Sequence, residues 1–263
     1  MLGLGNSLAG GAALDEWTPL TPSGLQVWLK AGTGMSSNQD ESGTGHTRST
    51  AAGNMADTDR INSWADQSGN GNDATQSTGS DMPKWDSATA DAGAAHWDSN
   101  NKWLDLDSNV TFSANEDFTV IVRFKRFDVG RALLGHATSD FLKIHGAGDI
   151  RFLDGGSANA WAEASLTLTD SDYYILVLTR SDGSTGNLHV HINGGVHSDV
   201  DWDAAESHTE TSSHTISNIG ASVDDGNEWK GHIKDVLIYK GYAFTSDDRS
   251  NLYNYIANQT QEQ

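Results

Sequence analysis

Apolar and polar residues alternate with period two along several short segments of the chain, a pattern typical of β-strands. The segments 25–31 (LQVWLKA) and 118–124 (FTVIVRF) alternate in this way. The segment 173–178 (YYILVL) is apolar throughout, which predicts a central strand buried on both faces. Segments 188–192 and 233–239 are further predicted strands, and the first of them ends in an Asn-Gly pair that favours a hairpin turn.

Only the end of the chain has a helical pattern. Thr245 or Ser246 can cap its start, acidic residues follow in the first turn, and an apolar stripe is formed by Leu252, Tyr255 and Ile256. Many strands separated by turns, with one terminal helix, predict an all-β fold. We therefore expect an antiparallel jelly-roll β-sandwich with a short C-terminal helix.

The pattern divides the chain into three parts. Residues 1–22 are Gly-rich and small, and they predict an N-terminal arm that docks on this chain or on a neighbour. Residues 23–258 form the predicted domain, and 259–263 form a tail. Within the domain, residues 32–60 are almost free of apolar side chains, which predicts a long loop.

Charge and cysteine content narrow the classes of partner and of chemistry. The chain has 36 acidic and 16 basic residues, a formal net charge of −20, which repels phosphate backbones and anionic lipids. We therefore expect no nucleic-acid partner, and no apolar run is long enough to predict membrane insertion. The absence of cysteine rules out disulfides and thiolate chemistry, and the start of the chain lacks the basic residues of a secretory signal.

The segment 64–76 (WADQSGNGNDATQ) predicts a rigid loop rich in oxygen atoms. Gly69 and Gly71 tolerate positive φ, and Asn and Asp side chains hydrogen-bond their own backbone in tight turns. Calcium binds six to eight oxygen atoms, and the loop offers Asp66, Asn70, Asn72 and Asp73 as candidate ligands. The alternative is that these oxygen atoms only stabilise the turn.

Three blocks of sequence carry a family resemblance. The first joins residues 27–31 to residues 64–74, the second is 174–194, and the third lies within 219–256. In these blocks the chain resembles the laminin G-like, concanavalin A-like jelly-roll domains of bacterial and tailed-phage proteins, over about residues 24–257. The resemblance implies the sandwich fold predicted above. It implies no single function, because jelly rolls serve as lectins, hydrolases and structural modules.

The sequence lacks the carboxylate motif of the glucanases that share this fold. Glycoside hydrolysis needs two carboxyl groups, and the jelly-roll glucanases that this fold resembles carry them as Glu-x-Asp-x-x-Glu, which does not occur here. Asp105 and Asp107 share a strand face but lack the glutamates. We therefore expect a protein that is not an enzyme, and a glycosidase or lyase using Asp105 or Asp107 remains the alternative.

Nine tryptophans raise the question of sugar binding, because flat aromatic rings stack on sugar faces. Trp28, Trp64 and Trp229 belong to the family blocks and are expected in the core. The candidate ligand-binding residues are Trp85, Trp97, Trp103, Trp161 and Trp202.

Several histidines are candidate zinc ligands, although the sequence favours calcium over zinc. His189 and His191 share one face of a predicted strand, and Glu206, His208 and Glu210 alternate nearby. The simpler interpretation places His189 and His191 on a solvent-exposed face.

Together these features favour a non-enzymatic virion structural protein of a tailed phage. It would be a head decoration or a fibre and adsorption component, assembled in the host cytoplasm and docked to other virion proteins by its arm. The opening residues 1–8 resemble marine phage structural proteins, and assembly into a homo-oligomer stays open. The alternative from another class is a carbohydrate-binding module that recognises a host surface glycan.

Overall fold

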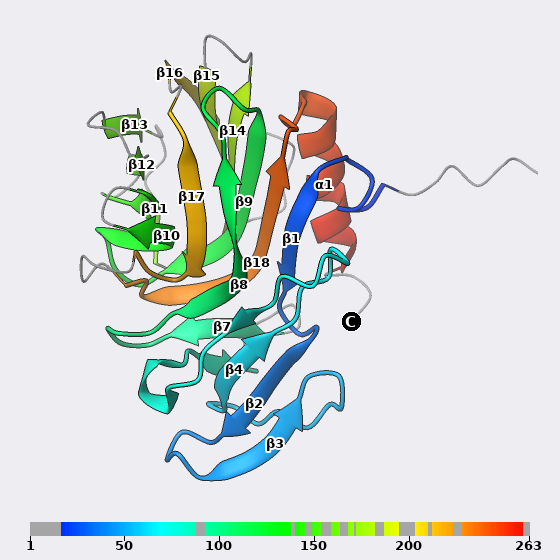
Figure 1. The fold of residues 1–263 in the computed structure, drawn as a ribbon, viewed down its shortest axis with the longest axis vertical. Helices are drawn as coiled ribbons and strands as arrows, with labels where there is room; N and C mark the ends of the chain where they lie inside the picture. The colour runs from blue at the N-terminus through cyan, green and yellow to red at the C-terminus, as the bar shows by residue number, and fades with distance from the viewer. Residues whose placement is uncertain are drawn as a thin grey trace, which may run out of the picture.

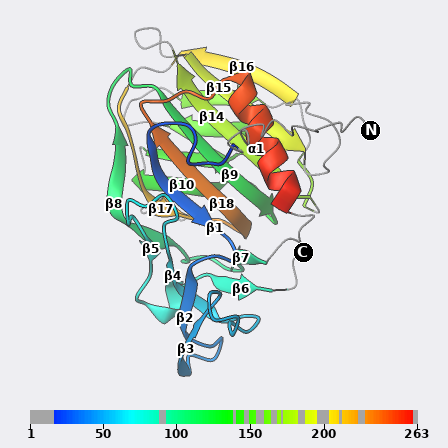
Figure 2. The same ribbon diagram turned by 90° about the vertical axis from the view of Figure 1, so that its right-hand side faces the viewer.

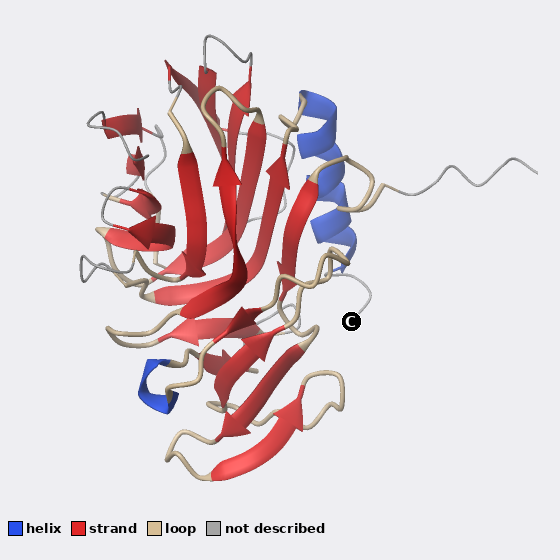
Figure 3. Cartoon of the chain, viewed as in Figure 1, coloured by secondary structure: helices blue, strands red, loops and turns tan. Residues whose placement is uncertain are grey.

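The computed structural model describes residues 17–87, 93–137, 140–145, 149–153, 159–163, 168–170, 172–181, 187–194, 203–209, 212–222 and 228–259. The described chain is a β-sandwich with one α-helix at its C-terminal end, as Figure 1 and Figure 3 show. The predicted all-β fold with a terminal helix is confirmed.

One layer, the back sheet, has the strand order β1, β18, β9, β14, β15 and β16, each antiparallel to its neighbour. The bounds are Leu25–Lys30 (β1), Phe118–Arg126 (β9), Tyr174–Ser181 (β14), Asn187–Gly194 (β15), Asp203–Thr209 (β16) and Gly231–Lys240 (β18). β14 lies between β9 and β15 and is buried along almost its whole length. This confirms the central strand predicted from its unbroken apolar run.

The other layer, the front sheet, has the order β10, β17, β8, β5, β4, β2 and β3. The bounds are Met35–Gln39 (β2), Gly45–Ser49 (β3), Arg60–Trp64 (β4), Ala74–Thr75 (β5), Leu104–Phe112 (β8), Arg131–Ala137 (β10) and His214–Ile219 (β17). The predicted long loop over 32–60 is therefore wrong, because β2 and β3 form a hairpin there. Their polar side chains gave no apolar alternation from which strands could be recognised.

Short strands connect or extend the two layers. β6 (Lys84–Asp86) and β7 (Ala94–Trp97) run from β4 to the start of β18, and a 3₁₀ turn (Gly79–Asp81) precedes them. A meander of β11 (Asp140–Ile144), β12 (Asp149–Leu153) and β13 (Asn159–Glu163) continues from β10. In Figure 1 this meander lies on the side of the molecule opposite the helix.

The core lies between the two layers and follows the period-two pattern. In β9 the side chains of Phe118, Val120, Val122 and Phe124 enter the main core, whereas Ile121 points to the opposite face. The front sheet contributes alternate residues of β8 to the same core, together with Ile216 and Ile219 of β17, where a register shift between Ile216 and Asn218 breaks the alternation. Burial of these side chains at roughly 1.5–3 kcal/mol each is the main force that holds the layers together.

The helix α1 (Ser246–Gln259) covers the outer face of the back sheet, as Figure 2 shows. Its start is capped as predicted: Thr245 Oγ1 accepts a hydrogen bond from Asp248 N at 3.2 Å, and Asp248 Oδ2 accepts one from Thr245 N at 2.9 Å. Leu252 and Ile256 are buried in a second apolar cluster with outer-face residues of the sheet. These contacts confirm the predicted apolar stripe.

The described end of the arm packs on the chain itself. Trp17 lies edge-on to Tyr255 of α1, with ring centroids 6.2 Å apart, and Tyr239 Oη donates a hydrogen bond to Pro19 O at 2.7 Å. Residues 1–16, which make up most of the predicted arm, lie outside the described residues, as does all but one residue of the predicted tail. Within the described part of the chain, no helix has the length and apolar character needed to cross a membrane.

Candidate functional site

A continuous row of polar positions crosses the outer face of the front sheet. The register pairs Ser36 with Ser63, Ser63 with Thr75, Thr75 with Asp105, Asp105 with Asn218, and Asn218 with Gly135. Their neighbours along the strands, such as Trp64 and Leu104, are buried in the core. Because side chains alternate between the two faces of a strand, this polar row faces away from the core.

A cleft of about 330 Å³ opens along the polar row. Its lining consists of hydroxyl, amide and carboxyl side chains: Asn38, Asn62, Ser63, Thr75, Gln76, Ser77 and Asp105. The volume is at the lower end of the roughly 300–1,000 Å³ typical of small-ligand sites. Among the described residues that line it, Asp105 is the one ionisable group. The cleft therefore offers hydrogen bonds in many directions with little charge.

Asp105 is held in place from two sides. Trp103 Nε1 donates a hydrogen bond to Asp105 Oδ2 at 3.2 Å, and Asn218 Nδ2 donates one to Asp105 Oδ1. Asn218 is itself almost fully buried and linked to Ser217, whose hydroxyl lies 2.9 Å from His136 Nδ1. Burial raises the pKa of Asp105 above its ordinary value. Asp105 stays exposed to solvent, so its carboxyl group is a fixed acceptor that a ligand in the cleft can reach.

Gln76 brings an unused donor to the cleft. Its side chain is 7% exposed, and its Oε1 accepts a hydrogen bond from Thr78 N at 2.9 Å. Its Nε2 is buried without a hydrogen-bond partner among the described residues. An unsatisfied buried donor is costly, and Nε2 is closed off from solvent, so a ligand could accept its hydrogen bond only after the Gln76 side chain turned toward the cleft.

The loop over residues 64–76 is organised around the carboxylate of Asp66. Its Oδ1 accepts hydrogen bonds from Trp28 N (2.8 Å) and Ser68 N (2.9 Å), and its Oδ2 accepts them from Ser68 Oγ (2.6 Å) and Asn72 N (3.1 Å). Asp73 Oδ1 in turn accepts a hydrogen bond from Asp66 N at 2.8 Å. Both carboxylate oxygens of Asp66 thus stabilise the turn.

The two asparagines of the same loop fasten it to neighbouring strands. Asn70 Nδ2 donates to Leu25 O at 2.8 Å, and Asn72 exchanges two hydrogen bonds with the backbone of Ser108. The loop thus links β1 to β8, and the side chains of Asn70 and Asn72 are directed to different strands. Gly69 and Gly71 adopt positive φ as predicted. Calcium binding here stays a prediction.

The predicted ligand-binding tryptophans separate into three groups. Trp97 is fully buried and Trp85 is 7% exposed, so the expectation that these two rings stack on a sugar is wrong: both fill the core. Trp103 is partly exposed and contacts Asp105 beside the cleft. The side chain of Trp161, in β13, and the whole of Trp202 lie outside the described residues. Of the tryptophans expected in the core, Trp64 and Trp229 are fully buried, and Trp28 packs partly buried against Tyr255 of α1.

The prediction that His189 and His191 both lie on a solvent-exposed face is wrong for His191. His191 is 7% exposed, and burial together with the positive charge of Arg249 lowers the pKa of His191 to about 4. The outer face of β15 is therefore covered at this position. The side chains of Glu206 and His208, and all of Glu210, lie outside the described residues.

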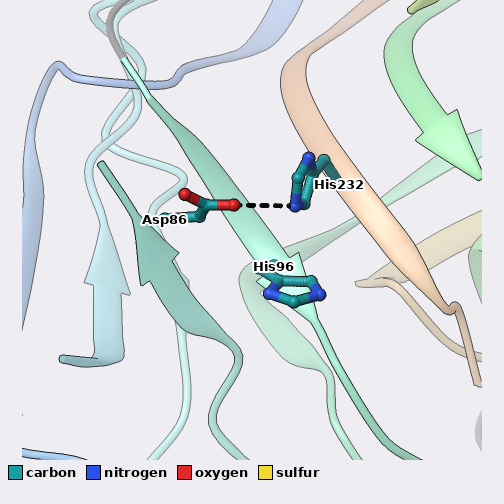
Figure 4. A group of neighbouring side chains, drawn as sticks. All are labelled: Asp86, His96 and His232. Atoms are coloured by element: carbon teal, nitrogen blue, oxygen red, sulfur yellow. Dashed lines mark ion pairs between the residues drawn. The ribbon is translucent and has the colours of Figure 1, made fainter. Parts of the chain in front are cut away.

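Potential metal ligands gather at a different place, where β6, β7 and β18 meet. Asp86, His96 and His232 each have one potential ligand atom there, and these three atoms lie within 4.8 Å of one another (Figure 4). Burial lowers the pKa of both imidazoles, and that of His232 to about 3. Sequence reasoning missed this group, because His232 is far in sequence from the other two.

The two antiparallel layers, the helix across the back sheet and the polar cleft on the front sheet define a lectin-like jelly roll. A family model described as the concanavalin A-like lectin/glucanases superfamily matches residues 98–248, which is more than half of the chain. The chain belongs to this superfamily.

Solved structures with the same fold are distant in sequence. An arabinofuranosidase complexed with arabinofuranosyl-alpha-1,2-xylobiose aligns with a TM-score of 0.60 at 14% identity, over 91% of this chain and 60% of that one. The binding domain of Paraclostridial Mosquitocidal Protein 1 aligns with a TM-score of 0.57 at 16% identity, over 74% and 50%. Domain 4 of AbnA, an extracellular arabinanase from Geobacillus stearothermophilus in complex with arabinotriose, aligns with a TM-score of 0.50 at 16% identity, over 72% and 92%.

These likenesses show the fold. The chain spans about half to three fifths of the first two solved structures. No curated protein sequence matches the chain.

Proposed function

We propose that this chain is a non-catalytic carbohydrate-binding domain that holds a glycan in the cleft along the polar row. The observation that carries the proposal is the cleft lining, which combines hydroxyl and amide groups with one fixed carboxylate. Sugar hydroxyls both donate and accept hydrogen bonds, so a site rich in Ser, Thr, Asn and Gln side chains complements them. The partly exposed Trp103 adds an aromatic ring beside this surface, and Gln76 would add a donor if its Nε2 turned toward the cleft.

The ligand is proposed to be uncharged. The chain carries a formal net charge of −20, and the only ionisable side chain among the described cleft residues is acidic. Both would repel acidic sugars. Two neighbours in fold, the arabinanase domain and the arabinofuranosidase, were solved with arabinose-containing oligosaccharides. Neutral pentose oligosaccharides are therefore the first ligands to test.

We propose that the chain is non-catalytic because only one carboxyl group lies among the described residues that line the cleft. Both retaining and inverting glycosidases require two carboxyl groups that flank the scissile bond, about 5–10 Å apart. The cleft is lined by Asp105, whereas Asp107 is not among the residues that line it. The hydrogen bonds that Asp105 accepts from Trp103 and Asn218 suit a residue that orients a ligand.

A role in a virion remains compatible with this proposal, since adsorption proteins recognise surface glycans. Because Trp17 and Pro19 pack on the chain's own helix and back sheet, the docking segment would be confined to residues 1–16. Deletion of 1–16 should then leave folding and glycan binding intact and abolish incorporation into particles. Unchanged incorporation would contradict the docking role.

The test of the proposed function is a glycan array followed by calorimetry with the full chain. We expect saturable binding of a neutral oligosaccharide that weakens in Gln76→Ala and Asp105→Asn. Thr111→Ala is a matched control, because Thr111 is exposed on the same strand as Asp105 but outside the 330 Å³ cleft. Absence of saturable binding to any glycan on the array would contradict the proposal.

A further inference from the structure

The backbone register brings Asp86, His96 and His232 onto one face of three adjacent strands. His96 of β7 lies directly opposite His232 of β18, and Asp86 of β6 lies opposite Ala94, two residues before His96. Residues two apart on a strand point to the same face, so the three side chains share it. Opposite and diagonal neighbours on adjacent strands are within reach of each other. The juxtaposition is therefore a property of the strand pairing.

The side chains use this proximity to converge. His232 Nε2 lies 3.1 Å from Asp86 Oδ2, and the rings of His96 and His232 meet edge-on with centroids 4.7 Å apart. Despite the short distance, His232 Nε2 is buried and has no hydrogen-bond partner in the described structure. A buried ring nitrogen next to a carboxylate oxygen, without a hydrogen bond between them, is an arrangement that a cation between the two atoms would stabilise.

The other nitrogen of His232 is already positioned. Tyr173 Oη lies 2.7 Å from His232 Nδ1, and Phe127 packs edge-on against both His96 and His232, with centroid distances of 5.6 and 5.0 Å. A hydrogen bond at the far nitrogen is the usual way in which a metal-ligating histidine is oriented. Tyr173 and Phe127 would thus fix the imidazole planes.

Charged groups of both signs surround the group. Lys125 and Lys234 lie over the ring of Tyr173, at 5.9 and 4.5 Å from its centroid. Lys84 of β6 is paired in register with His96, and it forms an ion pair with Asp98 at 2.6 Å. The carboxylates of Asp57 and Asp98 place negative charge near His96. The local positive charge is therefore offset, and the strongly acidic chain as a whole attracts cations.

We propose that Asp86, His96 and His232 bind one Zn²⁺ ion, with the fourth position open to water. Two imidazole nitrogens and one carboxylate oxygen suit zinc, whereas calcium prefers oxygen ligands throughout. Bonds of about 2.0–2.2 Å in a tetrahedral site place ligand atoms roughly 3.3–3.5 Å apart. The pair formed by Asp86 and His232 is already near this separation, and His96, which is only half-buried, has to move inward.

The ion would crosslink the short strands β6 and β7 to β18 of the back sheet. β6 and β7 connect the front sheet to the start of β18 in the back sheet, and Asp86 and His232 lie on opposite sides of this junction. A metal that binds the folded state but not the unfolded chain stabilises the fold through mass action. The proposal is independent of glycan binding, because none of the three ligands lines the cleft.

The test is calorimetric titration of the untagged full chain with Zn²⁺, followed by thermal unfolding with and without the ion. We expect one equivalent to bind and to raise the Tm. Asp86→Asn and His96→Gln should each weaken zinc binding by at least about tenfold, comparable to or larger than the loss on removing an outer-shell partner. Tyr173→Phe, which removes a positioning hydroxyl, should weaken it by about tenfold without changing the stoichiometry.

The matched control is His46→Gln. His46 Nε2 lies 3.6 Å from Asp59 Oδ1, so it is also a histidine beside a carboxylate, but it belongs to no three-residue cluster in the described structure. Zinc binding should be unchanged in this variant. Because His232 is buried, its replacement can unfold the chain, and the two more exposed ligands decide the outcome. Absence of binding, or equal binding in Asp86→Asn, His96→Gln and wild type, overturns the proposal and leaves a histidine–carboxylate pair only.

Discussion

The side chains of Asp105 and Asn218 face each other across β8 and β17, and the buried amide of Asn218 donates a hydrogen bond to the carboxyl group of Asp105. This contact joins two residues that are 113 positions apart in sequence. It fixes the one ionisable group that lines the described part of the cleft. Asp105 is therefore the residue whose charge should control ligand binding.

Glycan affinity should fall as the pH is lowered through the pKa of Asp105. Burial raises this pKa above the ordinary value of about 3.9, so the carboxylate loses its charge at a higher pH than a free aspartate. The ionised form accepts stronger hydrogen bonds from sugar hydroxyls than the protonated form. Calorimetry on a pH series that runs from about 3.9, the ordinary aspartate pKa, upward to neutrality should show this loss in wild type and a flat profile in Asp105→Asn.

The raised pKa of Asp105 also makes the free energy of unfolding depend on pH, in the opposite direction to glycan affinity. Because the folded chain binds the Asp105 proton more tightly than the unfolded chain, this group makes the free energy of unfolding decrease as the pH rises from the unfolded to the folded pKa. Above that window the ionised carboxylate is a constant cost. Urea unfolding across the window should show a smaller decrease in Asp105→Asn than in wild type, and identical slopes would contradict the raised pKa.

Gln76→Leu should weaken glycan binding with only a small loss of folding stability. The replacement removes a buried amide nitrogen that has no partner in the described structure, so the cost to folding is limited to the hydrogen bond with Thr78 N, about 1 kcal/mol. If Nε2 donates to the ligand, glycan affinity should fall about fivefold to tenfold. Retained affinity in a folded Gln76→Leu variant would exclude Gln76 from the site.

Trp97 and Trp103 should respond in opposite ways to replacement by alanine. Trp97 is fully buried, and truncation of such a side chain costs about 3–5 kcal/mol of stability. Trp103 is partly exposed beside Asp105, so Trp103→Ala should leave the free energy of unfolding within about 1 kcal/mol and weaken glycan binding. Denaturant unfolding and calorimetry on both variants check this contrast. Equal destabilisation by the two variants would mean that Trp103 is a core residue.

Asp66→Asn should destabilise the fold, because it replaces a charged acceptor of four hydrogen bonds. Hydrogen bonds to charged groups contribute about 1.5–3 kcal/mol, and we expect a loss of at least that size in urea unfolding. The same pair of proteins tests the calcium prediction. A rise in Tm with calcium that is present in wild type and absent in Asp66→Asn supports it, whereas an unchanged Tm in wild type contradicts it.

The local parts of this protein could be predicted from sequence. The alternation in 118–124 identifies which side chains face the core, and the terminal helix begins at the predicted cap. The polar loop around Asp66 forms its turn from residues only a few positions apart. The pattern of each of these features is set by near neighbours in sequence, through backbone periodicity and turn chemistry, although the Asp66 loop is also tied to distant strands.

The sites depend on tertiary structure. Period-two alternation shows that Asp105 faces away from the core, but it does not show which strand lies beside β8, so Asn218 could not be assigned as its partner. For the same reason the sequence placed Trp97 among the ligand-binding candidates, although it is buried in the core. His96 and His232 meet only because β7 pairs with the start of β18. The sequence by itself determined the strands with an apolar pattern, the helix and the polar turn, whereas strand order and register decided which distant side chains share a surface.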